Sequence, residues 1–339
     1  MNERKAYMDE FERIKSLAKV FPRHRDQLNS LFESDAEIVT MGDRKLAITI
    51  DEFSAEEDGF PSDDPETLGW NLVIATISDL LAVGADPKWL LHVVSVPDNR
   101  SDDFCDRLMK GVSCALAESG AWLIGGDLSR SADWRYVGNA IGTCGPRPIL
   151  RKTDVRHLQL YATGPFGSGN LAFLSAGSRF KLATRRELVA ETRDNIALAI
   201  DTSDGYRNTL LTLLKVNPGH SITARADPGI VHPDVQEFCD RNRLPPEGFL
   251  FGSAGEYELI LGVESARREA FEKAAGSRVF PIGTMTSDEE INAGTLFWQH
   301  PTRSAPIPDL PVSIDPREMP DRSAYIQELL HVIGRLFHR

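Results

Sequence analysis

The side chains in this sequence that could carry chemistry are aspartates that end an apolar run or stand beside glycine. Four such motifs contain Asp51, Asp79, Asp127 and the pair Asp201 and Asp204, and a weaker fifth contains Asp35. Carboxylates that gather from separate elements repel one another and raise each other's pKa unless divalent cations lie between them. Hard oxygen ligands without a histidine or cysteine cluster suit Mg²⁺, which usually keeps phosphate oxygens in its shell. The pattern therefore predicts a magnesium site that handles phosphate.

Asp79 is set into the apolar segment 69–87, which reads as a helix beginning near Gly69 and Trp70. The segment has almost no polar side, so the helix should be buried between layers. A buried carboxylate without a partner costs several kcal/mol, and no Lys or Arg lies within a turn or two on this helix. Asp79 could cap a break in the helix or meet an arginine from elsewhere, because buried carboxylates are usually paired. The other acidic motifs favour a metal cation.

Size and charge narrow the class of protein. A chain of 339 residues with 41% hydrophobic content can bury a large core and should form two domains. The net charge of −12 argues against nucleic acid as a partner, since binding a phosphate backbone requires a basic surface. An acidic protein can still bind nucleotides when metal ions neutralise the phosphates.

Neither a membrane span nor a secretory signal is predicted. No apolar run has the length that a span needs, and the first residues lack an apolar signal core. The cysteines are scattered without metal-binding spacing: Cys105, Cys114, Cys144 and Cys239. They are typical of reduced, mostly buried thiols, which indicates a cytoplasmic protein.

The elements that must position the aspartates follow from hydrophobic periodicity and turn residues. In the first half the patterns predict helices over 7–19, from 69 and over 102–119, strands over 38–39, 46–50, 89–96 and 136–142, a buried strand over 122–124, and an acidic loop over 52–64. In the second half they predict a strand over 158–163, a glycine-rich turn over 164–169, a helix from 170, a helix after Gly205, a strand over 258–263 and a closing strand over 280–283. The turn over 164–169 could offer amides to phosphate, although a plain tight turn is the commoner reading.

Clusters of proline and glycine, which interrupt helices and strands, predict the domain boundaries. The run Gly-Pro-Arg-Pro at 145–148 separates an N-terminal domain, 1–150, from a C-terminal domain, 151–300. Repeated prolines then mark residues 301–339 as an irregular connector with a last amphipathic helix, which should pack on the body or on a second subunit. The sequence assigns no role to the acidic loop 52–64 or to the tail 301–339.

At these motifs the sequence resembles the thiamine-monophosphate kinase family, within the superfamily of aminoimidazole ribonucleotide synthetase, selenophosphate synthetase and the hydrogenase-maturation dehydratase. The resemblance covers about residues 30–290. It is carried by Thr-Ile-Asp at 49–51, Gly-Trp and Ser-Asp-Leu-Leu-Ala-Val-Gly-Ala-Asp-Pro within 69–87, Gly-Gly-Asp-Leu-Ser-Arg at 125–130 and Asp-Thr-Ser-Asp-Gly at 201–205. Thr-Gly-Pro-Phe-Gly at 163–167 and Gly-Glu-Tyr-Glu-Leu at 255–259 add support.

The resemblance implies a two-domain α/β fold, in which the ATP- and Mg²⁺-binding N-terminal domain contributes strands to a barrel shared by a homodimer. A C-terminal α/β domain follows, and ATP with several Mg²⁺ ions lies between the domains. The metal positions that it implies are Asp35, Thr49, Asp51, Asp79, Asp127, Asp201 and Asp204. The nucleotide positions that it implies are Gly125, Gly126, Asp127, Arg151 and Ser203.

The implied reaction is phosphoryl transfer from ATP to thiamine phosphate or another small phosphorylated acceptor. Such transfer depends on positioning and metal charge rather than on covalent help from the protein. A phosphate acceptor needs no general base, so no catalytic side chain is assigned beyond the electrostatic role of Asp79 and Asp127. Two alternatives stay open: a synthetase or dehydratase of the superfamily that activates an amide or carboxyl oxygen, and a non-catalytic nucleotide-binding scaffold.

The sequence departs from the family pattern on the acceptor side. One carboxylate is missing at 33–36, Gly59-Phe60 replaces a His-Phe pair, and Gly255 replaces a glutamate at the substrate site. The tail also lacks the family's usual ending. The predicted acceptor contacts are therefore Gly59, Gly255 and Tyr257, within a pocket that differs from that of the family.

Overall fold

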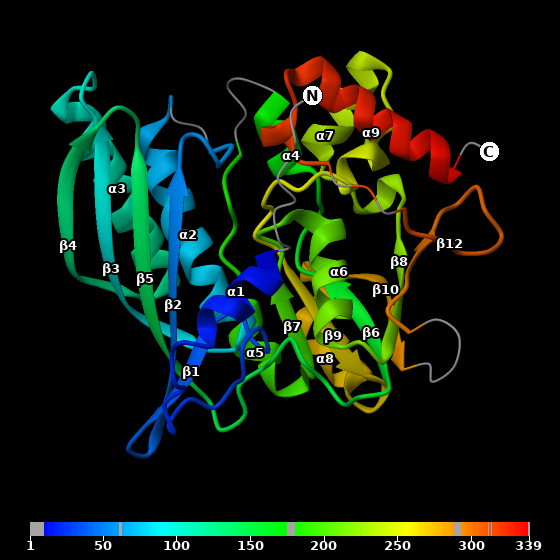
Figure 1. The fold of residues 1–339 in the computed structure, drawn as a ribbon, viewed down its shortest axis with the longest axis horizontal. Coiled ribbons are helices and arrows are strands. Elements are labelled where there is room, and N and C mark those ends of the chain that lie inside the picture. Colours follow the sequence, from blue (N-terminus) through cyan, green and yellow to red (C-terminus); the bar gives the residue numbers. More distant parts are fainter. Residues whose placement is uncertain are drawn as a thin grey trace.

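The computed structural model describes residues 10–60, 63–174, 180–287, 293–310, 312 and 314–337. The chain forms a mixed α/β structure with one sheet of five strands and one of seven (Figure 1). The predicted opening helix is present as α1 (Glu10–Ala18), and its predicted residues 7–9 lie outside the described part. No helix in the described residues is long and apolar enough to cross a membrane.

The first sheet has the strand order β1-β2-β5-β3-β4. Its strands are β1 (Glu37–Met41), β2 (Arg44–Ser54), β5 (Arg135–Cys144), β3 (Asp86–Pro97) and β4 (Trp122–Ser131). Only the pair β3 and β4 is parallel, and it is joined through α3 (Asp102–Ser119). This agrees with the crossover that a parallel pair requires. Along β3 buried residues alternate with exposed ones, so one face of the sheet is covered and the other is open.

The helix α2 (Pro65–Ala82) lies between the first sheet and the second half of the molecule (Figure 1). It contacts β2 and β5 on one side and β7 of the second sheet on the other, so it is buried almost all round, as its composition predicts. The helix begins at Pro65, earlier than the predicted start near Gly69, because proline suits the first turn of a helix. Asp79 is therefore held in the middle of the fold.

The second sheet has the order β12-β11-β8-β10-β6-β9-β7. Its strands are β6 (His157–Ala162), β7 (Leu198–Asp201), β8 (His220–Arg225), β9 (Leu259–Glu264), β10 (Phe280–Ser287), β11 (Leu296–Gln299) and β12 (Ile307–Pro308). The helices of this half are α4 (Ser168–Leu174), α5 (Arg186–Thr192), α6 (Gly205–Val216), α7 (Pro233–Asn242), α8 (Arg268–Ala275) and α9 (Arg322–Phe337). The strand predicted to close this half is not the last, since β11 and β12 extend the sheet beyond it. The predicted domain boundaries remain predictions.

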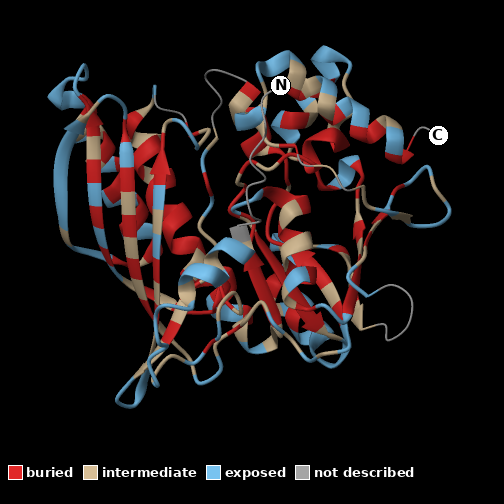
Figure 2. Cartoon of the chain, viewed as in Figure 1, coloured by how far each residue is buried: buried red, intermediate tan, exposed pale blue. Residues whose placement is uncertain are grey.

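The predicted burial of residues 122–124 is wrong. The exposed fractions are 75% for Trp122, 43% for Leu123 and 55% for Ile124, because β4 is an edge strand that little else covers (Figure 2). The expectation of mostly buried cysteines is also wrong: Cys239 is buried, Cys105 and Cys144 are half-buried and Cys114 is exposed.

Close packing of α2 on α3 depends on two glycines. A Cβ at Gly69 would lie 2.1 Å from the carbonyl oxygen of Leu108, and one at Gly111 would lie 2.0 Å from that of Glu66. Each contact is with backbone, which cannot rotate out of the way. The two helices can therefore approach only where these positions carry no side chain.

We predict that Gly69→Ala lowers the free energy of unfolding by about 1–3 kcal/mol, the usual cost of overpacking. Chemical denaturation followed by circular dichroism measures the change. Gly219→Ala is the matched control, since no atom lies within 4 Å of its added Cβ. Equal stability of the two variants would contradict this account of the helix pair.

Candidate metal centre and acceptor pocket

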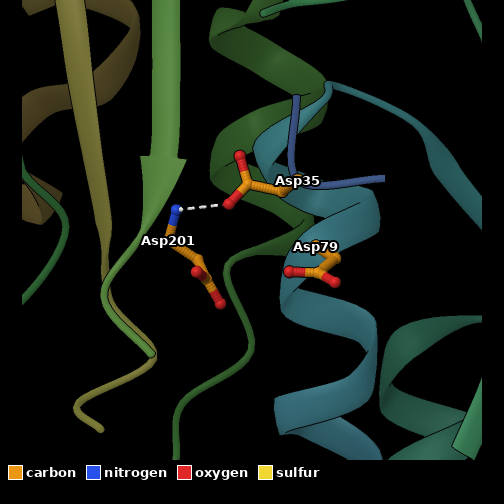
Figure 3. Close-up of side chains that lie close together, drawn as sticks. All are labelled: Asp35, Asp79 and Asp201. Carbon is orange, nitrogen blue, oxygen red and sulfur yellow. Dashed lines mark hydrogen bonds between the residues drawn. The ribbon is translucent and has the colours of Figure 1, made fainter. Parts of the chain in front are cut away.

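Three of the predicted metal ligands meet although they come from distant parts of the chain. Asp35 precedes β1, Asp79 lies in α2 and Asp201 ends β7. One carboxylate oxygen from each lies within 4.8 Å of the other two (Figure 3). The group contains only oxygen donors, which is the chemistry that Mg²⁺ prefers.

Hydrogen bonds from neighbouring hydroxyls orient two of these carboxylates. Thr49 Oγ1 on β2 donates to Asp79 Oδ2 at 2.5 Å, and Ser78 Oγ on α2 donates to Asp201 Oδ2 at 2.5 Å. The residue before Asp79 thus holds Asp201, which ties α2 to the end of β7. Thr49, predicted as a metal position, contacts the carboxylate cluster through its hydrogen bond to Asp79.

Asp35 is held by an arginine rather than by a hydroxyl. Arg151 Nη2 donates to Asp35 Oδ1 at 2.5 Å, and the amide of Asp201 donates to the same oxygen at 3.3 Å. The Asp35 side chain is only 1% exposed, and its Oδ2 is buried without a hydrogen-bond partner among the described residues. In the described part of the chain no Lys or Arg forms an ion pair with Asp79, so its predicted need for a cation is not met by the protein.

The electrostatics of the cluster favour protons or a cation. Burial raises the pKa of Asp51 to about 7, helped by the charges of Asp201 and Asp35. Burial likewise raises the pKa of Asp201 to about 7, with the charge of Asp35 adding to it. Burial and the nearby Asp51 raise the pKa of Asp79 well above its ordinary range. A divalent cation would offset the free-energy cost of holding these negative charges close together, so the residues present fit Mg²⁺.

Asp127, with its neighbours Gly125 and Gly126, lies elsewhere within a single chain. Asp127 pairs with Val93, and the register continues through Val137 to Glu52, which puts Asp127 three strand spacings, roughly 14 Å, from β2. Side chains alternate along a strand, so Asp127 shares the open face with Val93. Asp51 lies opposite Gly138 and so faces the helices. Within one chain, Asp127 therefore does not join the carboxylate cluster in which it was predicted to be central.

The predicted acceptor residues do come together. Gly59, Gly255 and Tyr257 line one pocket, which also contains Ser203 and Asp204 from the turn after β7. Ser203 Oγ donates to Asp201 Oδ1 at 3.0 Å, which connects this pocket to the carboxylate cluster. Arg151, the predicted phosphate contact, lines a neighbouring pocket with Ser203 and Asp204.

Several residues of the acceptor pocket were missed by sequence reasoning. They are Glu57, Asp58, Phe173, Phe180 and Arg317. Glu57 and Asp58 stand in the acidic loop just before Gly59, so the loop itself was the available signal. Arg317 lies in the tail and carried no signal, because only the path of the chain brings it here.

The glycine-rich turn at 164–169 does not offer its amides to a ligand. The amides of Gly167 and Gly169 donate to the Glu256 carboxylate at 2.8 and 3.1 Å. Glu256 is 4% exposed, and burial raises its pKa to about 8. The commoner reading of this segment as a plain turn is therefore supported, since the chain's own carboxyl group fills the place of a phosphate.

Comparison with known proteins shows the family and the fold. The family described as AIR synthase related protein, N-terminal domain, matches residues 33–144. The thiamine-monophosphate kinase of Methanopyrus kandleri is 31% identical over 216 residues, which is 60% of this chain and 69% of that relative. That of Archaeoglobus fulgidus is 31% identical over 137 residues, 40% of this chain and 45% of the relative, so this match spans less than half of that relative. A solved structure of AaThiL with AMPPCP and TMP superposes with a TM-score of 0.70 at 18% identity, covering 85% of this chain and 93% of that one.

The class follows first: the chain is an AIR synthase-related protein, in which three carboxylates lie close enough together to ligate a single metal ion. It belongs, more narrowly, to the thiamine-monophosphate kinase family. It is thus an enzyme of the ATP-dependent kinase class, with ATP and Mg²⁺ as the cofactors of that class.

We predict that the metal-free protein loses stability as the pH rises. The pKa values of Asp51 and Asp201 are about 7 in the folded chain, against an ordinary 3.8. Between about pH 4 and pH 7 the folded chain therefore holds protons that the unfolded chain has released, and stability falls with rising pH through this window. Melting temperatures in EDTA across pH 5–8 measure the effect.

Mg²⁺ competes with those protons, so it should raise the melting temperature more at pH 8 than at pH 5.5. Asp201→Asn, which keeps the shape but not the charge, should flatten both the pH slope and the Mg²⁺ effect. A melting temperature in EDTA that is constant over this pH range would show that the carboxylates are not coupled as the structure indicates.

Proposed function

We propose that the protein transfers the γ-phosphate of ATP to the phosphate group of a small acceptor, with thiamine phosphate as the first candidate. The observation that carries the proposal is the meeting of Asp35, Asp79 and Asp201 beside a pocket that contains Gly59, Gly255 and Tyr257. A metal centre next to an acceptor pocket is the arrangement that phosphoryl transfer requires.

The reaction needs positioning and charge neutralisation. An oxygen of the acceptor phosphate forms a bond to the γ-phosphorus while the bond from that phosphorus to the β–γ bridging oxygen breaks, and ADP leaves with the electron pair. Mg²⁺, when bound, supplies positive charge at the phosphate oxygens. Asp35, Asp79 and Asp201 would hold it, and Thr49 and Ser78 keep two of these carboxylates oriented. No proton has to be removed from a phosphate dianion, so no general base is required.

The pocket suits an acceptor with a flat, positively charged ring. The rings of Phe60 and Tyr257 lie 5.8 Å apart, and those of Phe60 and Phe180 lie 6.2 Å apart, which gives the pocket an aromatic wall. Glu57 and Asp58 add negative charge beside it. Aromatic faces and carboxylates together attract organic cations. Thiamine phosphate carries such a ring.

We predict that ADP forms with thiamine monophosphate and that Asp79→Asn lowers this rate at least about 100-fold, because loss of a metal ligand should exceed the cost of losing an outer-shell contact. A coupled assay of ADP release measures the rate. Asp102→Asn is the matched control, since the Asp102 side chain is 93% exposed and distant from the site. The variants should share the far-ultraviolet circular dichroism of the wild type.

Other outcomes of this assay would change or contradict the proposal. ADP formation only with another phosphorylated or carboxylated metabolite would replace thiamine phosphate as the acceptor. Nucleotide binding without turnover across a broad panel would contradict the proposed kinase reaction. Unchanged activity of Asp79→Asn would remove Asp79 from the site.

We further propose that the enzyme works as a homodimer. On the open face of the first sheet the exposed fractions of Trp89, Val93 and Ile50 are 40%, 40% and 67%. Large apolar side chains exposed on one face of a sheet favour an interface there. β4 is an edge strand, and β1 pairs only with residues 44–48 of β2, so the part of β2 that carries Thr49 and Asp51 has a free edge. A barrel closed by two copies would cover both edges and place the partner's strand β4, which carries Asp127, beside the part of β2 that carries Thr49 and Asp51.

Mixed dimers test this arrangement. We predict that Asp79→Asn and Asp127→Asn are each inactive as pure dimers, and that mixing the unfolded chains and refolding them together restores up to about half of the activity per mixed dimer. In the mixed dimer one site carries both changes and the other carries none. Absence of any recovery, with mixed dimers demonstrated by mass spectrometry, would place Asp127 outside the partner's site. The cytoplasmic location stays a prediction.

A further inference from the structure

The acceptor pocket has an unbalanced charge. Glu57, Asp58 and Asp204 line it, whereas Arg317 is the one Lys or Arg among the described residues that do so. Asp58 and Asp204 both interact electrostatically with Arg317. A phosphorylated acceptor must bring two negative charges into this surrounding. It would be repelled unless positive charge meets it. Mg²⁺ at the carboxylate cluster would supply part of that charge, and Arg317 is the pocket side chain placed to supply more.

Arg317 belongs to the tail that follows β12, and the tail is anchored to the body. Arg207 on α6 forms a buried ion pair with Asp309 at 2.6 Å, with 4% and 10% of the two side chains exposed. Further along, Ile314 is 1% exposed, and its carbonyl accepts a hydrogen bond from the amide of Ser253 at 3.0 Å. Ser253 itself lines the pocket. The tail is thus fixed to the pocket wall two residues before it delivers Pro316 and Arg317.

The guanidinium of Arg317 is held in one orientation. Its Nε donates to Asp315 Oδ1 at 2.8 Å and its Nη2 donates to Asp315 Oδ2 at 2.6 Å. The amide of Arg317 also donates to Asp315 Oδ1, at 2.9 Å, so Asp315 caps this turn of the tail. Nη1 has no acceptor among the described residues, and 44% of the side chain is exposed. One edge of the fork is therefore satisfied, while the other is available to a ligand.

We infer that Arg317 is a specificity-determining residue of the acceptor pocket, whose free Nη1 binds the phosphate group of the acceptor. This inference rests on the proposed function and names the group that the pocket selects. A preoriented arginine is well suited to phosphate because its planar donors match the phosphate oxygens. The tail 301–339 thereby gains a role, which is to supply the positive charge that the acidic pocket lacks.

A purely structural role for Arg317 is the competing explanation, because its bonds to Asp315 would by themselves stabilise the turn. The two explanations differ in what they predict for ligands. A structural residue would affect phosphorylated and unphosphorylated ligands equally, whereas a phosphate contact would affect only the former.

The test measures binding by calorimetry to the full chain saturated with Mg²⁺ and AMPPCP, a nucleotide analogue that cannot donate its phosphate. The probes are thiamine monophosphate, thiamine and inorganic phosphate. Arg317→Ala should bind thiamine monophosphate and inorganic phosphate roughly 10- to 100-fold more weakly, the range for a lost charge-assisted hydrogen bond, and thiamine with little change. Arg317→Lys should fall between, because it keeps the charge but not the fork. Arg322→Ala, an exposed arginine on α9, is the control and should match the wild type.

Each outcome decides the inference. Loss confined to the two phosphate-bearing probes supports it, whereas an equal loss for thiamine, or no loss, overturns it. Absence of wild-type binding of both phosphate probes also overturns it. Wild-type binding of thiamine monophosphate, weakened in Arg317→Ala, together with no ADP formation from ATP, would contradict the proposed function while leaving Arg317 as a phosphate contact.

Discussion

The repulsion among buried carboxylates is the constraint on which the rest of this structure depends. Asp35, Asp79 and Asp201 are held close together by the fold, and within the described part of the chain only Asp35 has an arginine at hydrogen-bonding distance. Such a group is unfavourable without protons or a cation, so a divalent metal bound there would stabilise the folded state. The hydroxyls of Thr49 and Ser78 orient the carboxylates but bring no positive charge. The repulsion among the carboxylates therefore determines both the stability of the fold and its affinity for a metal ion.

The placement of α2 explains how one helix can serve both sheets. Its apolar sides pack on the first sheet and against β7, so the carboxylate of Asp79 is carried to the junction of the two halves. Ser78, one residue earlier, reaches Asp201 at the end of β7. A shift of α2 along its axis would break all of these contacts at once. The close approach of α3 at Gly69 and Gly111 limits such a shift, which links helix packing to the geometry of the site.

Several charged groups around the pocket are paired within the chain. Glu256 occupies the amides of the glycine-rich turn, Arg185 pairs with Glu258, and Arg207 pairs with Asp309. These contacts hold the neighbouring loops in place. Because the charged groups already have partners, they are not available to a ligand. The Nη1 of Arg317 and the buried Oδ2 of Asp35 have no hydrogen-bond partner among the described residues, and both lie where a ligand is expected.

Much of the site could be predicted from the sequence, because apolar runs that end in aspartate indicate buried carboxylates whatever their partners are. The strand that leads to Asp51 and the helix that carries Asp79 were likewise evident from periodicity, whereas the strand that ends at Asp201 was not predicted. The sequence by itself determined the kind of site, an all-oxygen metal centre on an α/β framework. Only the tertiary structure decided which residues meet there. The face of a strand on which a side chain lies depends on register, which separated Asp127 from Asp51, and the path of the tail depends on long-range contacts, which brought Arg317 to a pocket that local sequence could not reveal.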